Sequence, residues 1–176
     1  MDLPAPAAEN RGMAFRFLVL AAALAASAAG AQQLATVGSQ SRDTATLSVG
    51  ASNFAVGRVA RECLGVVGRS ESPDQFITQW RQRNARFVSA SSRYIEKRLE
   101  EAAASGGPDK REALLRDIRD AVQGSGDSLA RTLLQRGRKE EACMNAVTLV
   151  DTGVLDITPK LPTYSDIESL VRWAEQ

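Results

Sequence analysis

The two cysteines are the residues whose type and spacing could do covalent chemistry. Cys63 and Cys143 each stand among apolar residues that recur every three or four positions, which places both at the centre of an apolar helical face. Redox pairs usually lie close together, as in a C-x-x-C motif, whereas these two are far apart in the chain. We therefore predict a structural disulfide between two helices, which by chain-entropy arithmetic would stabilise the fold by roughly 4 kcal/mol.

The chain contains no histidine. Histidine is the most frequent general base and metal ligand, and it is the usual partner of a serine or cysteine nucleophile. A Ser-His-Asp site and a histidine-ligated zinc site are therefore excluded, and two cysteines are too few for a thiolate zinc site or an iron–sulfur cluster. The sequence also lacks a glycine-rich phosphate loop and a calcium-binding loop. We expect no metal, no cofactor and no enzymatic activity.

The triplet Asp151-Thr152-Gly153 resembles the hydrophobic-D-T-G element of aspartic proteases. Those enzymes need two such carboxylates facing each other, and this chain has one copy in a region without strand patterning. Gly153 is better explained as the residue that follows the end of a helix. A hydrolase that cleaves an envelope glycan with carboxylates alone is the alternative enzyme class, and Asp151 and Asp156 are its candidate acids.

The N-terminal residues have the order of a secretory signal peptide. Arg11 and Arg16 precede an uncharged apolar run over residues 17–31, which ends in the small residues A-G-A. We predict a signal peptide over residues 1–31 and a mature protein in the periplasm or outside the cell. If this segment is not cleaved, the protein is instead a membrane-tethered structural component, although the run is shorter than the ~20 residues of a spanning helix.

The rest of the chain divides into a leader and one domain. Residues 32–51 are rich in serine, threonine and glycine and lack helical periodicity, so we predict a flexible polar leader. Residues 52–176 are predicted to form a single helical domain. The formal net charge is +1 with acids and bases interspersed, which argues against binding to nucleic acid or to an anionic membrane. After signal cleavage we expect no stable membrane insertion.

Two long helices dominate the predicted domain. A first helix covers residues 52–67. A second begins at Ser72-Pro73, which supply a hydroxyl cap and a proline in the first turn, and its apolar stripe continues to about residue 104. A third runs over residues 109–135, so that the second and third form an antiparallel hairpin. Its sequence G-S-G at 124–126 could be a break, but the stripe keeps its phase and we expect a continuous helix.

Two shorter helices complete the prediction. One contains Cys143 and ends before Gly153, and the other begins at Ser165, with Glu168 completing a capping box. Together these patterns predict an all-α fold. It is a four- to five-helix bundle built around a long antiparallel helical hairpin, with one inter-helix disulfide.

Two groups of residues on the second helix are candidate binding sites. Asn84 falls inside the apolar stripe beside Trp80 and Phe87, so these three form either a hydrogen-bonded part of the core or a niche for a ligand or partner. On the opposite side, basic residues form either a solvated face or a rim for an acidic protein or an anionic envelope polymer. The residues of this basic rim are Arg86, Arg93 and Lys97.

The sequence favours an exported, non-catalytic binding or accessory protein. Export, the absence of catalytic constellations and a disulfide-held helical scaffold all fit a protein that presents a helix face or groove to another envelope or secreted protein. Inhibitors, immunity proteins and assembly chaperones share this description. No motif identifies the partner or the oligomeric state.

Overall fold

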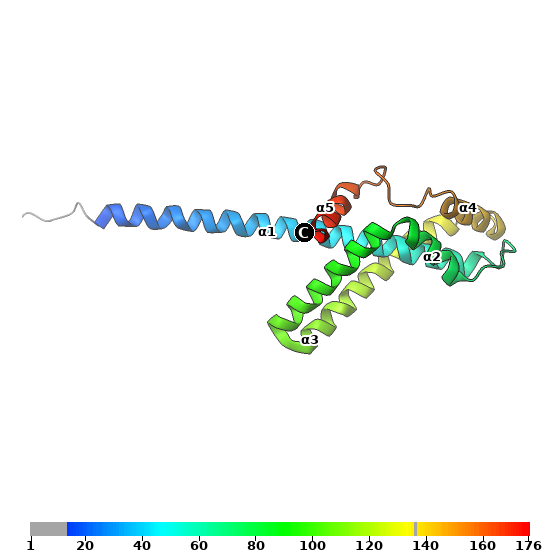
Figure 1. Cartoon of the computed structure of the whole chain (residues 1–176), viewed down its shortest axis with the longest axis horizontal. Coiled ribbons are helices and arrows are strands. Elements are labelled where there is room, and N and C mark those ends of the chain that lie inside the picture. The colour runs from blue at the N-terminus through cyan, green and yellow to red at the C-terminus, as the bar shows by residue number, and fades with distance from the viewer. Residues whose placement is uncertain (1–13, 136) are drawn as a thin grey trace, which may run out of the picture. The chain divides into compact units, whose positions relative to one another are not determined.

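The computed structural model describes residues 14–135 and 137–176, and these residues contain five helices and no strand (Figure 1). The helices are α1 (Ala14–Cys63), α2 (Pro73–Arg83), α3 (Ala85–Leu134), α4 (Lys139–Asp151) and α5 (Tyr164–Ala174). The chain divides into two compact units. In the first, which ends at Gln40, the described residues all belong to α1. Every contact discussed below lies in the second unit, Ser41–Gln176. The predicted all-α class is confirmed.

The predicted flexible leader is wrong, because residues 32–51 are part of α1. Ala45 and Val49 lie four positions apart and are only 0% and 3% exposed, so this stretch contributes to the core. Serine, threonine and glycine give it little intrinsic tendency to form a helix. Within residues 41–51, packing of the small apolar face against the other helices stabilises the helix instead, as is usual for helices in globular proteins.

The second predicted helix begins as expected but is interrupted. The Ser72 hydroxyl accepts a hydrogen bond from the Gln75 amide, the Gln75 side chain accepts one from the Ser72 amide, and Pro73 is the first helical residue. The helix then ends at Arg83, because Asn84 adopts φ −106° and ψ 21°. A single helix through residue 104 is therefore wrong: α2 and α3 meet at Asn84.

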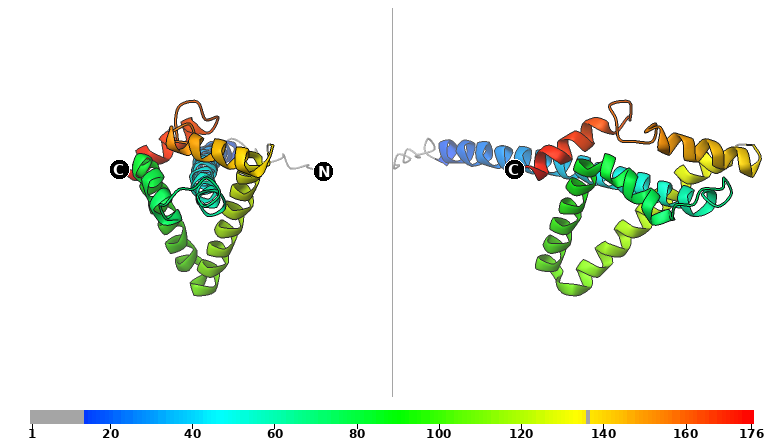
Figure 2. Two further views of the ribbon diagram at one scale, coloured as in Figure 1. Left: turned by 90° about the vertical axis from the view of Figure 1, so that its right-hand side faces the viewer. Right: turned by 45° about the vertical axis from the view of Figure 1, so that its right-hand side comes forward.

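α3 is itself the predicted helical hairpin. Its course reverses at Gly106 and Gly107, whose backbone angles are not helical, and Gly107 adopts φ +72°, a left-handed conformation that favours glycine. We call residues 85–105 the first arm and residues 108–134 the second arm. Figure 2 shows the arms diverging from this turn, with the later part of α1 lying at their open end.

Glycines allow α1 to approach the second arm closely. A Cβ atom on Gly126 would lie 2.6 Å from a ring carbon of Phe54, and one on Gly50 would lie 2.7 Å from a methyl group of Val122. The second arm is continuous through residues 124–126, as predicted. Gly126 is therefore a packing residue in an unbroken helix rather than a break.

The core lies where α1, α2, the first arm, α4 and α5 meet. Its largest fully buried side chains include Trp80, Phe76, Ile167 and Leu170. The predicted disulfide is present: Cys63 at the end of α1 is bonded to Cys143 in α4, with 4.9 Å between their Cα atoms. It thereby links the two ends of the segment that contains α2 and α3.

The predicted capping box at the start of α5 is wrong. The helix begins at Tyr164, one residue earlier than expected, and the N-cap Thr163 makes no side-chain capping hydrogen bond. Glu168 instead accepts a hydrogen bond of 2.5 Å from the Tyr164 hydroxyl and forms an ion pair with Arg86. The Glu168 carboxylate, which the sequence predicts to cap α5, is instead used in the ion pair with Arg86.

Candidate functional site

The three residues of the predicted niche are buried and their polar atoms are satisfied by the fold. The Trp80 indole donates a hydrogen bond of 3.0 Å to the carbonyl of Leu155. The Asn84 amide group donates to the carbonyl of Trp80 and to Asp156, and its oxygen accepts a bond of 2.8 Å from the Ile157 amide. Phe87 packs edge-on against the ring of Tyr164. These contacts fasten residues 155–157 to the junction of α2 and α3.

The predicted basic rim is engaged in internal contacts. Arg86 pairs with Glu168 and stacks over Phe87, 4.6 Å from the ring centroid. Arg93 donates a hydrogen bond of 2.8 Å to the carbonyl of Ala174 at the end of α5. The Lys97 ammonium lies 3.3 Å from a carboxylate oxygen of Glu101, one helical turn away. Two of the three cations therefore hold α5 against the first arm, and the third is on the solvated side of that arm.

The candidate hydrolase acids accept hydrogen bonds that link different parts of the fold. Asp151 accepts a hydrogen bond of 2.7 Å from Arg69. Asp156 accepts one of 2.9 Å from Arg83 and another from Asn84. Gly153 adopts φ +74° directly after α4, which confirms its predicted role at the end of that helix.

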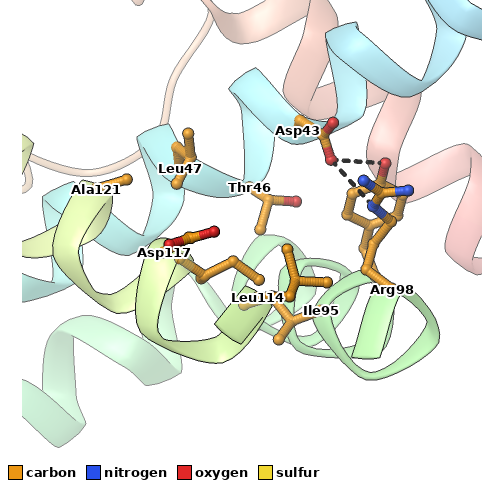
Figure 3. A pocket seen from close by; sticks show the side chains of 10 residues that line it. Asp43, Thr46, Leu47, Ile95, Arg98, Leu114, Asp117 and Ala121 are labelled. Atoms are coloured by element: carbon orange, nitrogen blue, oxygen red, sulfur yellow. Dashed lines mark hydrogen bonds and ion pairs between the residues drawn. The ribbon is translucent and has the colours of Figure 1, made fainter. Parts of the chain in front are cut away.

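A cavity that the sequence did not predict lies between α1 and the two arms of α3. Its volume is about 240 Å³. Figure 3 shows that all three elements contribute side chains to it, and we call it the inter-arm cavity. It is lined by Asp43, Thr46, Leu47, Tyr94, Ile95, Arg98, Leu114, Asp117, Ile118 and Ala121. Most of this lining is apolar.

One side of the inter-arm cavity carries a hydrogen-bonded cluster. The carboxylate of Asp43 accepts a hydrogen bond of 2.9 Å from the Tyr94 hydroxyl, and the same oxygen lies 3.5 Å from the Arg98 guanidinium (Figure 3). Burial, followed by the hydrogen bond to Asp43, raises the pKa of Tyr94 to about 12. The phenol is therefore protonated near neutral pH and acts as a donor to Asp43.

Two further polar groups line the cavity without partners. The hydroxyl oxygen of Thr46 is buried and has no hydrogen-bond partner within the described part of the chain, although the residue is only 4% exposed. The carboxylate of Asp117, on the second arm, is exposed and has neither an ion pair nor a hydrogen bond among the same residues. Figure 3 places Thr46 between Asp117 and the Asp43–Arg98 pair. With two carboxylates and one guanidinium, the lining has a net formal charge of −1.

Sequence reasoning missed this cavity for two reasons. The sequence predicts a leader over Thr46 and Leu47, so this part of α1 has no predicted place beside the hairpin. The apolar stripe of the predicted helix over residues 109–135 is expected to face the core, which implies that the arms pack together along their length. The apolar stripe of residues 109–135 is long, and its length could have indicated that another helix packs against it.

Comparisons with protein-family models, with curated proteins and with solved structures found no match. No helix in the described residues is both long and apolar enough to span a bilayer. The described residues also contain no group of three or more histidine, cysteine, aspartate or glutamate side chains arranged to hold a metal ion. The inter-arm cavity and the half-buried apolar residues of the second arm are therefore the features on which a functional proposal can rest.

Proposed function

We propose that the protein is an exported, non-catalytic binding protein of the periplasm or the extracellular space, and that the second arm of α3 presents an apolar face to another envelope or secreted protein. The observation that carries this proposal is the difference between the two arms. Phe87, Ala90 and Tyr94 of the first arm are buried, whereas five apolar side chains of the second arm are only half-buried. These half-buried residues are Leu114, Leu115, Ile118, Ala121 and Val122.

An apolar stripe that is half-covered in the isolated chain supports a docking role. Contiguous exposed apolar surface on a small protein is often a site of interaction, since its burial against a partner is favourable. The second arm is also anchored at both ends, by the Gly106-Gly107 turn and by the packing of Ala130 in the core. A partner would therefore meet a pre-ordered helix and little entropy would be lost on binding.

Export is supported by the chemistry of the cysteines. Cys63 and Cys143 are 0% and 2% exposed and bonded to each other. Protein disulfides form and persist mainly in oxidising compartments, such as the periplasm and the extracellular space. This agrees with the arginine, apolar run and small-residue motif at the N-terminus.

A carboxylate-only hydrolase is less well supported than binding. Such an enzyme needs one acid held in its protonated form by burial, opposite a second carboxylate across a cleft. Asp43 and Asp117 do line one cavity, but the Asp43 side chain is 44% exposed and Asp117 is exposed. The cavity wall between them is mainly aliphatic, which suits an apolar group better than a sugar ring.

Site-specific photo-crosslinking tests the docking role. A photoreactive residue at Leu115 should form an adduct with one envelope or secreted protein, whereas the same residue at the exposed position Asp120, on another side of the arm, should form none. Leu115→Asp should abolish co-purification of that protein while leaving the circular dichroism spectrum unchanged. Equal adducts from both positions, or none from Leu115, would contradict the proposal.

A further inference from the structure

The inter-arm cavity combines an apolar enclosure with polar groups that the fold leaves unpaired. We propose that it binds a small amphipathic amine, a short apolar chain that carries one protonated amino group. This proposal requires neither export nor a docked protein, although Leu114, Ile118 and Ala121 belong both to the apolar stripe proposed above as a docking face and to the lining of the inter-arm cavity.

The apolar chain of such a ligand would lie against aliphatic side chains from all three elements. Leu47 comes from α1, Ile95 from the first arm, and Leu114 and Ile118 from the second arm. The volume of about 240 Å³ is just below the range of about 300–1,000 Å³ that is usual for ligand pockets, so the ligand is small. Each methylene group that is buried should raise affinity about fourfold.

The hydroxyl of Thr46 gives the cavity a polar atom that needs a partner. A buried hydroxyl without a hydrogen bond destabilises a protein, because the group has lost water and gained nothing in return. In helices, threonine often satisfies its hydroxyl by bonding to a carbonyl three or four residues earlier, but Thr46 makes no such bond. An amino group can donate a hydrogen bond to this oxygen.

The charges of the lining select a cation. Arg98 lies 3.5 Å from the carboxylate of Asp43, which also accepts the Tyr94 hydrogen bond. The Arg98 guanidinium also lies 3.5 Å from the carboxylate of Glu101, so it already has two carboxylate partners. The carboxylate of Asp117 has no cationic partner within the described residues. A protonated amine would therefore be attracted to Asp117, while a carboxylate ligand would be repelled by it and would find the guanidinium occupied.

Titration of the purified, oxidised protein with three ligands of the same chain length tests this selection. The ligands are n-hexylamine, n-hexanol and n-hexanoate, which carry a positive charge, no charge and a negative charge at neutral pH. Binding is followed by amide chemical shifts in ¹H–¹⁵N NMR spectra. We expect saturable binding of the amine, with shifts concentrated around Thr46, Ile95 and Leu114, affinity about tenfold lower for the alcohol, and no saturation by the carboxylate.

Variants then distinguish specific recognition of the amino group from nonspecific apolar binding. Asp117→Asn should lower the affinity for hexylamine about tenfold and leave that for hexanol unchanged, since only the charged hydrogen bond is lost. The matched control Asp120→Asn makes the same change one turn further along, at an exposed residue that does not line the cavity, and should alter affinity less than twofold. Ala121→Trp should fill the cavity and abolish binding of both ligands.

Three results would overturn the proposal. The first is the absence of saturable binding by hexylamine, which would mean that the cavity holds only water. The second is equal affinity for amine and carboxylate. The third is an equal effect of Asp117→Asn and Asp120→Asn. Both aspartates are exposed, so these variants are expected to fold, and their circular dichroism spectra provide the check.

Discussion

The side-chain oxygen of Asn84 accepts a hydrogen bond of 2.8 Å from the backbone amide of Ile157, 73 positions further along the chain. The same side chain donates to Trp80 and to Asp156, and Asn84 is only 1% exposed. One buried amide thus bonds to a carbonyl near the end of α2, at the junction with α3, and holds the coil that precedes α5. This relationship explains why the apolar stripe of the sequence is continuous here while the helix is not.

Asn84→Ala should therefore destabilise the fold by about 2–3 kcal/mol. The substitution leaves the Ile157 amide buried without an acceptor, and an unsatisfied buried donor is more costly than the average hydrogen bond is favourable. Urea unfolding monitored by tryptophan fluorescence measures the change. Gln82→Ala, at a nearby exposed position, is the control and should change stability by less than about 0.5 kcal/mol. Equal effects of the two variants would show that the Asn84 contacts are unimportant.

Two glycines in the second arm should respond to alanine with opposite signs. A Cβ atom on Gly126 would lie within 2.6–2.9 Å of Phe54, so Gly126→Ala should destabilise by about 1–3 kcal/mol. A Cβ atom on Gly124 would meet nothing within 4 Å, so Gly124→Ala should stabilise the helix by about 0.5–1 kcal/mol. Thermal unfolding of both variants tests the packing of α1 on the second arm. Stabilisation by both would mean that Phe54 does not occupy this position.

Removal of the disulfide should lower the free energy of unfolding by about 2–4 kcal/mol. The bond spans 80 positions between Cys63 and Cys143, so its main effect is to restrict the unfolded chain. Chemical unfolding with and without a thiol reductant measures the loss. The double variant Cys63→Ala/Cys143→Ala controls for other effects of the reductant and should not respond to it. Free thiols in protein isolated from an oxidising compartment would contradict the bond.

The Tyr94 phenol should make stability depend on pH at the alkaline end. Its pKa is raised to about 12 in the folded protein, whereas that of tyrosine in an unfolded chain is about 10. Above pH ~10 the unfolded chain loses this proton while the folded protein retains it, so the stabilisation is complete below pH ~10 and is lost as the pH rises toward 12. Tyr94→Phe should flatten this part of the stability curve.

Absorbance of the phenolate reports the same group directly. The chain contains two tyrosines, so Tyr94→Phe leaves Tyr164 as the sole contributor. The late ionisation step should disappear from the titration of this variant. If the late step persists, then Tyr94 is not the residue with the raised pKa.

Export should be visible in the N-terminal residue of the recovered protein. Protein recovered from the periplasm or the culture medium should begin near Gln32, because the A-G-A sequence places the cleavage site directly before it. N-terminal sequencing of that material decides the matter. An intact segment over residues 17–31 in membrane-bound protein would instead support a tethered component.

The features predicted correctly from the sequence are those fixed by local chemistry. The Ser72-Pro73 start needs only a hydroxyl and a ring at adjacent positions, and Gly153 needs only a backbone that tolerates positive φ. The pairing of Cys63 with Cys143 followed from two apolar faces and the absence of any other cysteine.

The features that were missed depend on distant partners. Residues 41–51 are helical because their small side chains fit against the hairpin, which no window of sequence around them reveals. The break at Asn84 depends on Asp156 and Ile157, and the lost cap at Glu168 depends on Arg86. The inter-arm cavity needs α1 and both arms in place, so it is a property of the assembled fold alone.

The bond between Cys63 and Cys143 closes a covalent ring that contains all of α2 and α3. A protease that cut the exposed turn near Gly107 would therefore open the ring without separating its two pieces. The nicked protein should migrate as one species on a non-reducing gel and as two fragments after reduction. A molecule built in this way can be cut once at this turn and still keep its two halves joined.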